Sequence, residues 1–212
     1  FTVAGGQGTR LGFDGPKGCY PAGPVSGKPL FACLAEWINA ARRRFAPKGI
    51  VEVPIPWYIM TSPLNHDDTV SFFEQHAYFG LPKDDVIFFQ QGVMPSLDLH
   101  AGKLLLSDKG TIAVNPDGHG GSLKALWDRG AIRDMRERGV EHISYTQVDN
   151  PLVRVLDPVF VGLHAEAPDS SAQMSSKMVP KASPDEKAGV LCRADGRTAV
   201  IEYSDLPDEL AN

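Results

Sequence analysis

The sequence predicts a three-layer α/β fold with a mostly parallel sheet. Short apolar runs such as residues 57–61 and 86–89 are typical of strands buried on both faces. These runs alternate with segments of helical periodicity, which places helices on both sides of the sheet. The chain has 212 residues and a mass of 23.0 kDa, and 42% of its residues are hydrophobic and 22% charged. These values suit one folded domain of substantial size.

The first half of the chain is expected to contain three strands and two helices. Residues 1–3 are the tail of a buried strand, and a glycine-punctuated loop follows through residue 28. From residue 29 the apolar positions recur at helical spacing, which predicts one buried stripe. The stripe comprises Leu30, Phe31, Leu34, Trp37, Ile38, Ala41 and Phe45. Arginines 42–44 are expected to form the solvated end of that helix. After the strand at 57–61, Asn65 can cap a second helix over 66–79, and the third strand is 86–89.

The second half begins with a predicted hairpin, in which residues 103–106 and 111–114 flank the turn 107–110. A helix after Gly121 is expected to direct Leu123, Leu126 and Trp127 inward, and residues 131–138 add another short helix. A strand over 142–148 then runs directly into Asp149. The rest is predicted as a helix over 158–165 and β-rich segments around 178, 190–192 and 199–203. Without a repeat or a linker, residues 1–212 are expected to be a single domain, incomplete at both ends.

Composition excludes several classes of function. Lys+Arg 21 against Asp+Glu 26 gives a net charge of −5 and a pI of about 5.7, which argues against a nucleic-acid binder. Mean hydropathy is −0.17, and no apolar run approaches the ~20 residues that cross a bilayer, so no membrane partner is expected. The cysteines, Cys19, Cys33 and Cys192, are odd in number and form no C-x-x-C pair. This pattern favours a reducing, cytoplasmic setting.

The loop after the first strand carries the strongest chemical signal. It reads VAGGQGTRLG at residues 3–12 and PKG at 16–18. Its glycines free backbone N–H groups, and Arg10 and Lys17 supply two cations suited to a polyphosphate. A Rossmann fingerprint would need glycine where Leu11 stands, and a Walker A loop fails on spacing and has Pro29 in place of Ser or Thr. An ordinary glycine-rich turn is the alternative, but it leaves both cations unexplained.

Three further residues follow predicted strands or lie among glycines. Asp149 ends a strand, where it can bind a divalent cation or a sugar hydroxyl, or cap the turn before Pro151. His119 is surrounded by glycines 118, 120 and 121, where the backbone can approach a ligand, although a lone histidine is usually structural. Gln91 follows the third strand and could equally be a solvated surface residue. In open α/β sheets, ligands bind beyond the carboxyl ends of the strands, where these residues are expected.

The order of these motifs resembles the eukaryotic-type UDP-N-acetylhexosamine pyrophosphorylases, a branch of the UDP-sugar pyrophosphorylase family. The resemblance rests on AGGQGTRLG at 4–12 with PKG at 16–18, FFQQG at 88–92, PDGHGG at 116–121, VDN at 148–150 and VIEYS at 200–204. It covers nearly the whole chain. It implies a Rossmann-like nucleotidyltransferase fold of the glycosyltransferase-A type.

The resemblance also implies roles for individual residues. Arg10 and Lys17 would be the catalytic residues, which stabilise negative charge on the phosphates. The nucleotide would be bound by Val3, Ala4, Gly5, Gly6, Lys17, Gln91, Gly118 and Asp149, with the amide of Gln91 reading the uracil edge. The sugar would be bound by His119, Gly189, Glu202 and Tyr203. Asp149 would lie beside Mg²⁺ or Mn²⁺. Many relatives have Asn in place of His119. Glucose-using relatives have a Gly-His-Gly pattern, but it is preceded by His rather than by Asp117. The choice of sugar therefore stays open.

The implied reaction is uridylyl transfer from UTP to N-acetylglucosamine 1-phosphate, which yields the UDP-sugar and pyrophosphate. Two alternatives remain: a UTP–glucose-1-phosphate or broad UDP-sugar uridylyltransferase, and a nucleotide-sugar-binding module without turnover. The second arises because the family's further Asn and Lys positions lie beyond Asn212. Residues 1–212 alone are therefore expected to bind UTP or UDP but to turn over sugar 1-phosphate hardly at all. The sequence leaves the oligomeric state open.

Overall fold

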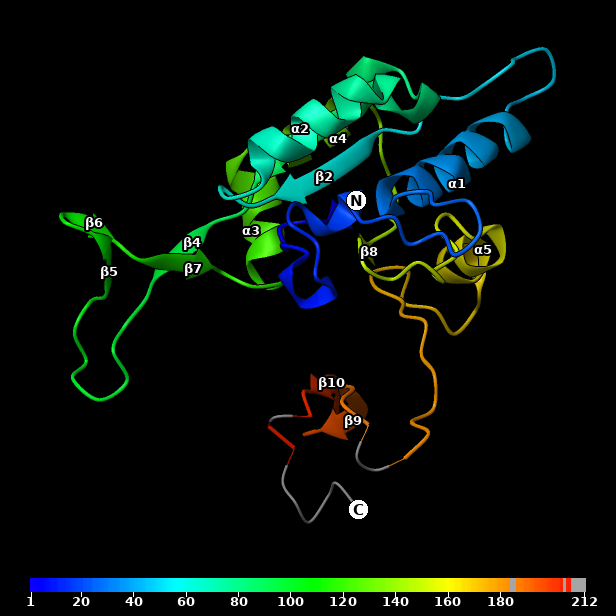
Figure 1. Cartoon of the computed structure of the whole chain (residues 1–212). Helices are drawn as coiled ribbons and strands as arrows, with labels where there is room; N and C mark the ends of the chain where they lie inside the picture. The colour runs from blue at the N-terminus through cyan, green and yellow to red at the C-terminus, as the bar shows by residue number, and fades with distance from the viewer. Residues whose placement is uncertain (184–185, 204, 207–212) are drawn as a thin grey trace. The chain divides into compact units, whose positions relative to one another are not determined.

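The computed structural model describes residues 1–183, 186–203 and 205–206 (Figure 1). The chain forms two compact units, Phe1–Val161 and Gly162–Asn212. The first unit contains a parallel sheet with helices, and the second contains a hairpin. Among the described residues, no helix has the length and apolar character needed to cross a bilayer.

A four-stranded sheet in the order β3-β2-β1-β8 forms the centre of the first unit, and all its pairs are parallel. Its strands are β1 (Thr2–Val3), β2 (Trp57–Thr61), β3 (Val86–Gln90) and β8 (Thr146–Gln147). The prediction of a parallel sheet is confirmed. The strand expected over 142–148 is shorter than predicted: only Thr146 and Gln147 pair with β1. The backbone N–H of Val148 still donates to the carbonyl of Val3 at 3.1 Å.

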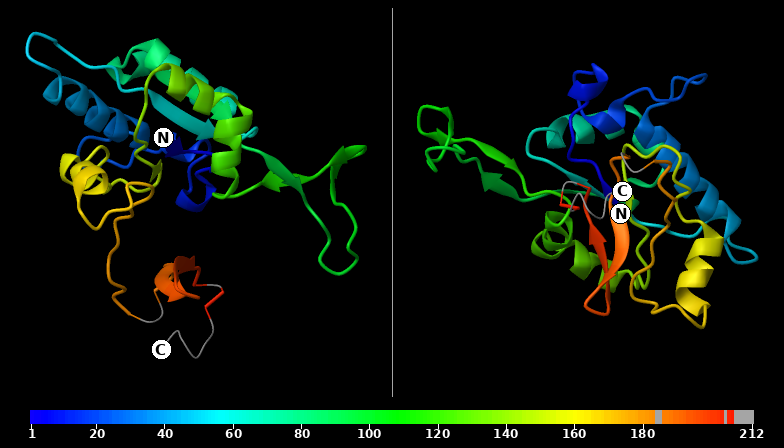
Figure 2. Two further views of the ribbon diagram at one scale, coloured as in Figure 1. Left: turned by 180° about the vertical axis from the view of Figure 1, so that it is seen from behind. Right: turned by 90° about the horizontal axis from the view of Figure 1, so that it is seen from below.

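Strand β2 separates two hydrophobic cores. The helices that cover the sheet are α1 (Leu30–Arg44), α2 (His66–Gln75), α3 (Gly121–Asp128) and α4 (Ala131–Glu137). All five residues of β2 are buried, and successive side chains point to opposite faces. Trp57 and Ile59 pack with α1 and α2, whereas Tyr58 and Met60 pack with α3 and α4. Figure 2 shows these helices on the two sides of β2. The predicted three-layer arrangement is therefore confirmed.

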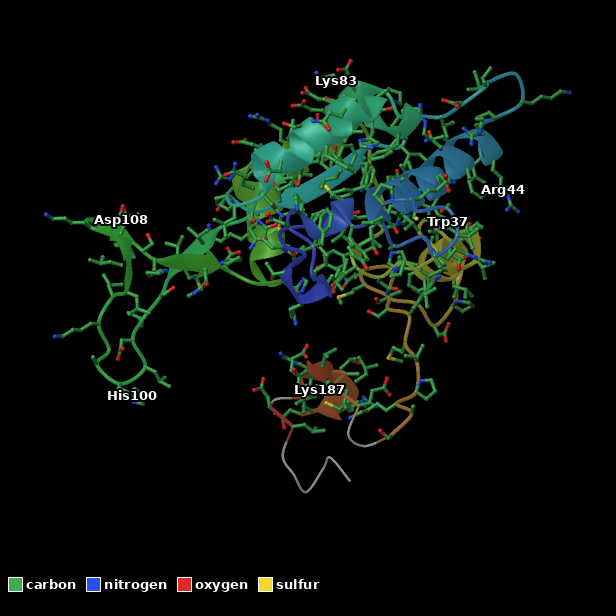
Figure 3. All side chains as sticks on the ribbon, in the orientation of Figure 1. Trp37, Arg44, Lys83, His100, Asp108 and Lys187 are labelled. Carbon is green, nitrogen blue, oxygen red and sulfur yellow. The ribbon has the colours of Figure 1, made fainter. Side chains whose placement is uncertain are left out.

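Helix α1 buries most of the predicted stripe but not all of it. Trp37 is 42% exposed and Phe45 is 47% exposed, so the prediction that both are buried is wrong. Arg44 points into solvent at the end of the helix (Figure 3). Arg42, in contrast, is buried between the carboxylates of Asp85 and Glu52, at 3.3 and 3.2 Å. The solvated helix end predicted from the arginine run therefore excludes Arg42, whose charge is paired inside the protein.

Helix α2 ends at Gln75, earlier than the predicted 79. Residues Ala77–Gly80 form the 3₁₀ turn η3, in which Tyr78 and Phe79 have positive φ angles of 52° and 55°. Such left-handed residues cannot continue an α-helix, so the chain reverses there. Asn65 does occupy the predicted N-cap position of α2, but its side chain makes no capping hydrogen bond to the helix. It binds the glycine loop instead.

Helix α3 packs through a different face from the predicted one. Its buried residues are Ser122, Ala125 and Leu126, which share one side of the helix at spacings of three and four. Leu123 and Trp127 lie on the opposite side and are 69% and 65% exposed. Only the inward direction predicted for Leu126 is therefore correct.

An arm projects from the sheet between β3 and α3 (Figures 1 and 2). It contains β4 (Val93–Pro95), β5 (Leu106–Asp108), β6 (Thr111–Ile112) and β7 (Val114–Pro116). Strand β5 pairs with β6 in an antiparallel hairpin, as predicted, but only residues 106–108 and 111–112 form it. Val114, which was expected in the second strand of that hairpin, lies instead in β7, and β7 pairs antiparallel with β4. Three more 3₁₀ turns are η1 (Thr9–Leu11), η2 (Lys17–Cys19) and η4 (Lys83–Asp85).

Helix α5 (Pro158–Glu166) runs from the first unit into the second. The second unit contains the antiparallel pair β9 (Val190–Ala194) and β10 (Arg197–Ile201), which confirms two of the three predicted β-rich segments. The segment around Met178 forms no strand. Pro180 lies two residues further on and has no N–H to donate to a strand ladder.

Candidate active site

The carboxyl ends of the four parallel strands gather the predicted nucleotide residues at one edge of the sheet. Ala4 follows β1, Gln91 follows β3, and Asp149 comes two residues after β8. Parallel strands end at the same edge, so these residues approach one another although they are separated by up to 145 positions in the sequence. This edge is the usual ligand site of an open α/β sheet.

The glycine loop leaves β1 and folds back on itself. Ala4 is buried, and its N–H donates to the carbonyl of Met60 at 2.7 Å. Further along, the N–H of Gly8 donates to Gly15 at 2.9 Å and the N–H of Lys17 donates to Gly6 at 3.0 Å. This return places the Lys17 ammonium beside Gly6, where a Cβ atom would lie 3.6 Å from Nζ. The loop therefore holds a cation against its own glycine backbone.

Lys17 and Asp149 form the central ion pair of the site. Lys17 Nζ lies 2.8 Å from Asp149 Oδ2, and the two side chains are 15% and 40% exposed. Partial burial on its own would raise the pKa of the Asp149 carboxyl. The hydrogen bond and charge of Lys17 outweigh that effect, with a smaller contribution from His119, and lower the pKa below its usual range. Asp149 is therefore ionised at neutral pH and faces the Lys17 ammonium.

The side chain of Gln91 packs against the glycine loop at Gly5. Gln91 is only 5% exposed, and its backbone N–H donates to the carbonyl of Thr61 at 2.8 Å. A Cβ atom added at Gly5 would overlap the Gln91 amide oxygen, so the glycine is required for this contact. Burial decides against the solvated-surface interpretation of Gln91. Its amide lies against the loop, where a flat base could pack on a surface free of side chains.

The glycine-rich segment after β7 supplies another part of the edge. His119 is exposed, and its Nδ1 lies 3.2 Å from the hydroxyl of Tyr145. Gly118 adopts a left-handed φ of 73°, a conformation that favours glycine. Asp117 was not singled out by the sequence pattern. Its carboxylate lies so close to Gly92 and Gly121 that a Cβ at either glycine would overlap it. Within the described residues, Asp117 Oδ1 is buried without a hydrogen-bond partner.

Asn65 is a second residue that the sequence pattern did not assign to the site. Its Nδ2 donates to the carbonyls of Ala4 and Gly6, at 3.0 and 3.2 Å. Its Oδ1 accepts from the backbone N–H of Ser62 at 2.8 Å. A possible signal was its position, four residues after the end of a strand whose carboxyl edge faces the glycine loop.

The remaining predicted residues are Arg10 in the first unit and three residues of the second unit. Arg10 is exposed on the 3₁₀ turn η1. In the second unit, a Cβ at Gly189 would lie 3.5 Å from Glu202 Oε1, so these two predicted sugar residues are neighbours. Tyr203 follows them and is 48% exposed. The roles predicted for these four residues remain predictions.

The donor set suits a cation that arrives with the substrate. Within the described residues, no three His, Cys, Asp or Glu side chains cluster in a way that could hold a metal ion. Asp149 offers one carboxylate beside Lys17. Magnesium is commonly bound by one or two carboxylates together with substrate phosphates and water. Asp149 therefore fits Mg²⁺ held mainly through a nucleotide.

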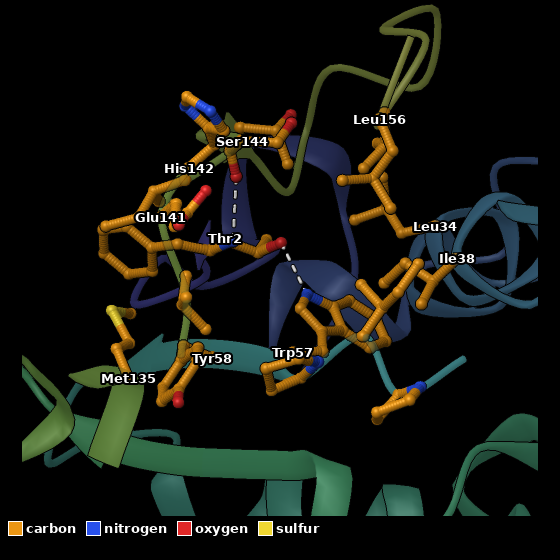
Figure 4. A pocket seen from close by; sticks show the side chains of 18 residues that line it. Thr2, Leu34, Ile38, Trp57, Tyr58, Met135, Glu141, His142, Ser144 and Leu156 are labelled. Atoms are coloured by element: carbon orange, nitrogen blue, oxygen red, sulfur yellow. Dashed lines mark hydrogen bonds between the residues drawn. The ribbon is translucent and has the colours of Figure 1, made fainter. Parts of the chain in front are cut away.

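Two cavities lie outside the ion-pair region. An apolar pocket of about 190 Å³ lies at the amino ends of the strands, lined by residues that include Trp57, Tyr58 and Met135 (Figure 4). Trp57 Nε1 donates there to the Thr2 hydroxyl at 2.8 Å. A second cavity of about 590 Å³ is bordered by Gly92, Asp117 and Arg129. The second cavity adjoins the segments that carry Gln91 and His119.

A profile of the UTP–glucose-1-phosphate uridylyltransferase family matches residues 1–212. The chain belongs to this family. Its curated relatives include UDP-N-acetylglucosamine diphosphorylase 2 of Arabidopsis thaliana, which is 43% identical over 218 residues. A protein of Schizosaccharomyces pombe described as a probable UDP-N-acetylglucosamine pyrophosphorylase is 42% identical over 212 residues. Each match covers 99% of this uridylyltransferase-family chain. It covers only 42% of the Arabidopsis relative and 44% of the Schizosaccharomyces relative.

A solved structure supports the same assignment. The uridine diphosphate N-acetylglucosamine pyrophosphorylase of Trypanosoma brucei, crystallised with an inhibitor, superposes on this family member with a TM-score of 0.83. The two sequences are 32% identical, and the match covers 97% of this chain and 42% of the other. The predicted nucleotidyltransferase fold is therefore confirmed.

Proposed function

We propose that the protein transfers the uridylyl group of UTP to N-acetylglucosamine 1-phosphate and releases pyrophosphate. The observation that carries the proposal is the contact chain from Gly6 to Lys17 to Asp149 at the carboxyl edge of the sheet. It joins a glycine backbone, a cation and a carboxylate, which together suit a nucleoside triphosphate and its metal ion. The names of the Arabidopsis and Trypanosoma relatives support N-acetylglucosamine as the sugar.

The proposed reaction is an in-line displacement at phosphorus. A phosphate oxygen of the sugar 1-phosphate attacks the α-phosphorus of UTP and forms the new P–O bond. The bond between the α-phosphorus and the oxygen bridging to the β-phosphorus breaks, and pyrophosphate leaves with that electron pair. Since the step needs no covalent intermediate, positioning and charge stabilisation supply the catalysis.

Different residues would contact the phosphates, the uracil and the sugar. Lys17 and Arg10 offset the charge that builds on the α- and β-phosphates. The uracil lies between the glycine backbone and the amide of Gln91, with Val3, Ala4 and Gly118 completing the nucleotide side. His119, Gly189, Glu202 and Tyr203 bind the sugar, where a carboxylate such as Glu202 can accept hydrogen bonds from two hydroxyls.

Magnesium, or manganese in its place, belongs to this proposal. Asp149 would hold the ion together with the phosphates, and the ion when bound would neutralise part of their negative charge. Lys17, at 2.8 Å from Asp149, keeps the carboxylate ionised and ready for a cation. A cytoplasmic setting stays a prediction from the cysteine pattern.

A pyrophosphate-release assay on the full-length protein tests the proposal. UTP is supplied with N-acetylglucosamine 1-phosphate, N-acetylgalactosamine 1-phosphate or glucose 1-phosphate in parallel reactions. The expected result is the highest kcat/KM with N-acetylglucosamine 1-phosphate. A preference for glucose 1-phosphate would instead support the reaction that names the family profile. UTP binding without pyrophosphate release from any sugar would identify a binding module and contradict the proposal.

A further inference from the structure

Asn65 fastens the glycine loop to the rest of the first unit. The residue is only 1% exposed, and its backbone carbonyl accepts hydrogen bonds from the N–H and hydroxyl of Thr69, at 3.0 and 2.6 Å, in the first turn of α2. Its side-chain amide uses both donors on the loop, at Ala4 and Gly6. Its oxygen accepts from both the N–H and the hydroxyl of Ser62. All four hydrogen-bonding positions of the amide are therefore occupied.

These bonds fix the orientation of two peptide groups in the loop. In a trans peptide the C=O and the following N–H point in opposite directions. Asn65 holds the carbonyl of Ala4 and, together with the backbone N–H of Lys17, that of Gly6, so the N–H groups of Gly5 and Gln7 face the other way. No hydrogen bond described for residues 1–183, 186–203 and 205–206 uses either of these N–H groups. They remain available as donors for a ligand that carries acceptor oxygens.

We infer that Asn65 is a positioning residue for the nucleotide: it orients the Gly5 and Gln7 N–H groups towards UTP. The inference rests on the proposed function. Two observations separate this role from ordinary core packing. Both donors of the amide go to the glycine loop, and the backbone of Asn65 is anchored on a helix. A residue that is itself held rigidly can set the loop geometry before the nucleotide binds.

Asn65→Asp is the sharpest test because it keeps the shape and the acceptor but removes both donors. The new carboxylate would face two carbonyl oxygens and repel them. The Ala4–Gly5 peptide would be displaced most, because the Gly6 carbonyl is still held by the backbone N–H of Lys17. We expect the Kd for UTP to rise by about 10- to 100-fold. The matched control is Asn39→Asp, because Asn39 Nδ2 makes the same kind of bond to the carbonyl of Phe79, at 3.0 Å, away from the loop. The control is expected to leave the Kd unchanged.

A pH profile distinguishes positioning from a loss of stability. The ratio of the variant Kd to the wild-type Kd is measured by calorimetry between about pH 8 and pH 5, below the unfolding temperature of each protein. As the pH falls, the introduced carboxyl takes up a proton and regains one O–H donor, so the ratio should shrink. A purely structural defect would lower the unfolding temperature without this recovery. An unchanged Kd in a folded Asn65→Asp protein overturns the inference while leaving the proposed function intact.

A second measurement needs no variant and decides the matter if Asn65→Asp does not fold. Amide hydrogen exchange of the wild-type protein is followed by NMR with and without UTP. Exchange at the Gly5 and Gln7 N–H groups should slow when UTP binds, and unchanged exchange with bound UTP would overturn the inference. If the wild-type protein binds no UTP at all, the proposed function fails, and the role of Asn65 fails with it.

Discussion

The side chain of Lys17 is held in place in the free protein by its ion pair with Asp149. Its ammonium is only 15% exposed and lies 2.8 Å from Asp149, so part of the entropy of a long side chain is already lost in the free protein. A cation fixed in this way acts on developing negative charge without having to reorganise. The residue most closely tied to the proposed chemistry is therefore also among the best anchored at the edge of the sheet.

Lys17→Ala should lower kcat much more than it raises the KM for UTP. Removal of one preorganised contact to a developing charge typically costs about 10²–10³ in rate. Lys28→Ala is the control, because Lys28 also pairs with a carboxylate, Glu36, but lies beyond the motifs at residues 3–12 and 16–18. Steady-state kinetics on both variants check this expectation. A Lys17→Ala enzyme with more than about half of the normal kcat removes Lys17 from the mechanism.

Gln91→Ala should weaken UTP binding and relax discrimination against CTP. A buried amide that pairs with one base edge rejects the other by leaving polar groups unpaired. The adjacent Gln90→Ala serves as control, since Gln90 ends β3 and its carbonyl, not its side chain, accepts from Arg129. Competition titrations with UTP and CTP give the ratio of affinities. An unchanged ratio would mean that the backbone around Gly6 reads the base without Gln91.

The Lys17–Asp149 pair should survive across neutral pH and break only in acid. Lys17 lowers the pKa of Asp149 below the usual value of 3.8, against the opposing effect of burial. A lowered carboxyl pKa gives a stabilisation that is complete above the unfolded value and is lost as the pH falls through the folded value. The difference in unfolding temperature between wild type and Asp149→Asn should thus be constant from about pH 6 to pH 8 and shrink below about pH 4. A difference that already shrinks above about pH 6 would contradict the assignment.

At the scale of elements, ion pairs to one carboxylate connect the end of α1 and the residue that follows α4 (Ala131–Glu137) to the start of β3. Arg42 binds Asp85 at 3.3 Å, and Arg138 binds the other oxygen of the same carboxylate at 3.2 Å. Asp85 ends the 3₁₀ turn that leads directly into β3. This one carboxylate therefore links elements from both helical layers at the end of the sheet opposite the proposed site.

Arg42→Ala should destabilise the fold strongly, because it leaves a buried carboxylate without one of its partners. Breaking a buried pair by removing one member typically costs about 3–5 kcal/mol. Arg43→Ala is the matched control: Arg43 is the next residue, is 58% exposed and lies 3.8 Å from Glu52. Exposed pairs contribute about 0–1 kcal/mol. Urea unfolding of both variants gives the comparison, and equal midpoints would show that the Arg42 pair contributes little.

The local sequence pattern predicted which helices and strands form better than it predicted which face of each helix is buried. The parallel strands and the glycine loop could be predicted, because apolar runs and glycine spacing are contained within a few neighbouring residues. The direction of Trp127 could not, since an eight-residue helix offers several apolar stripes and only the packed partner selects one. The roles of Asn65 and Asp117 were also invisible. Their contacts are to backbone atoms up to 61 positions away, which no local pattern encodes.

At the scale of the whole first unit, one strand serves both cores. Ile59 and Met60 are neighbours in β2, yet each belongs to a different core and each is fully buried. Loss of packing on one side therefore removes support from the strand that the other side also needs. The two helical layers should consequently lose their structure together.

Ile59→Ala and Met60→Ala should each shift a single unfolding transition, although they open different cores. Such truncations typically cost about 2–5 kcal/mol. The measurement is urea unfolding followed both by tryptophan fluorescence and by far-UV circular dichroism. Coincident curves are expected for both variants. Separate transitions in either variant would show that the two cores are independent.

The order of the strands also sets the order in which the sheet can be completed during synthesis. Thr2 pairs with Ile59 on one side and with Thr146 on the other, so β1 lies between partners made long after it. Closing the longer of these loops is slow, because its entropic cost must be met before the contact is gained. During synthesis, more than a hundred further residues must therefore be added before β8 can pair with the second edge of β1. Until then that edge of β1 is exposed and is a binding site for chaperones.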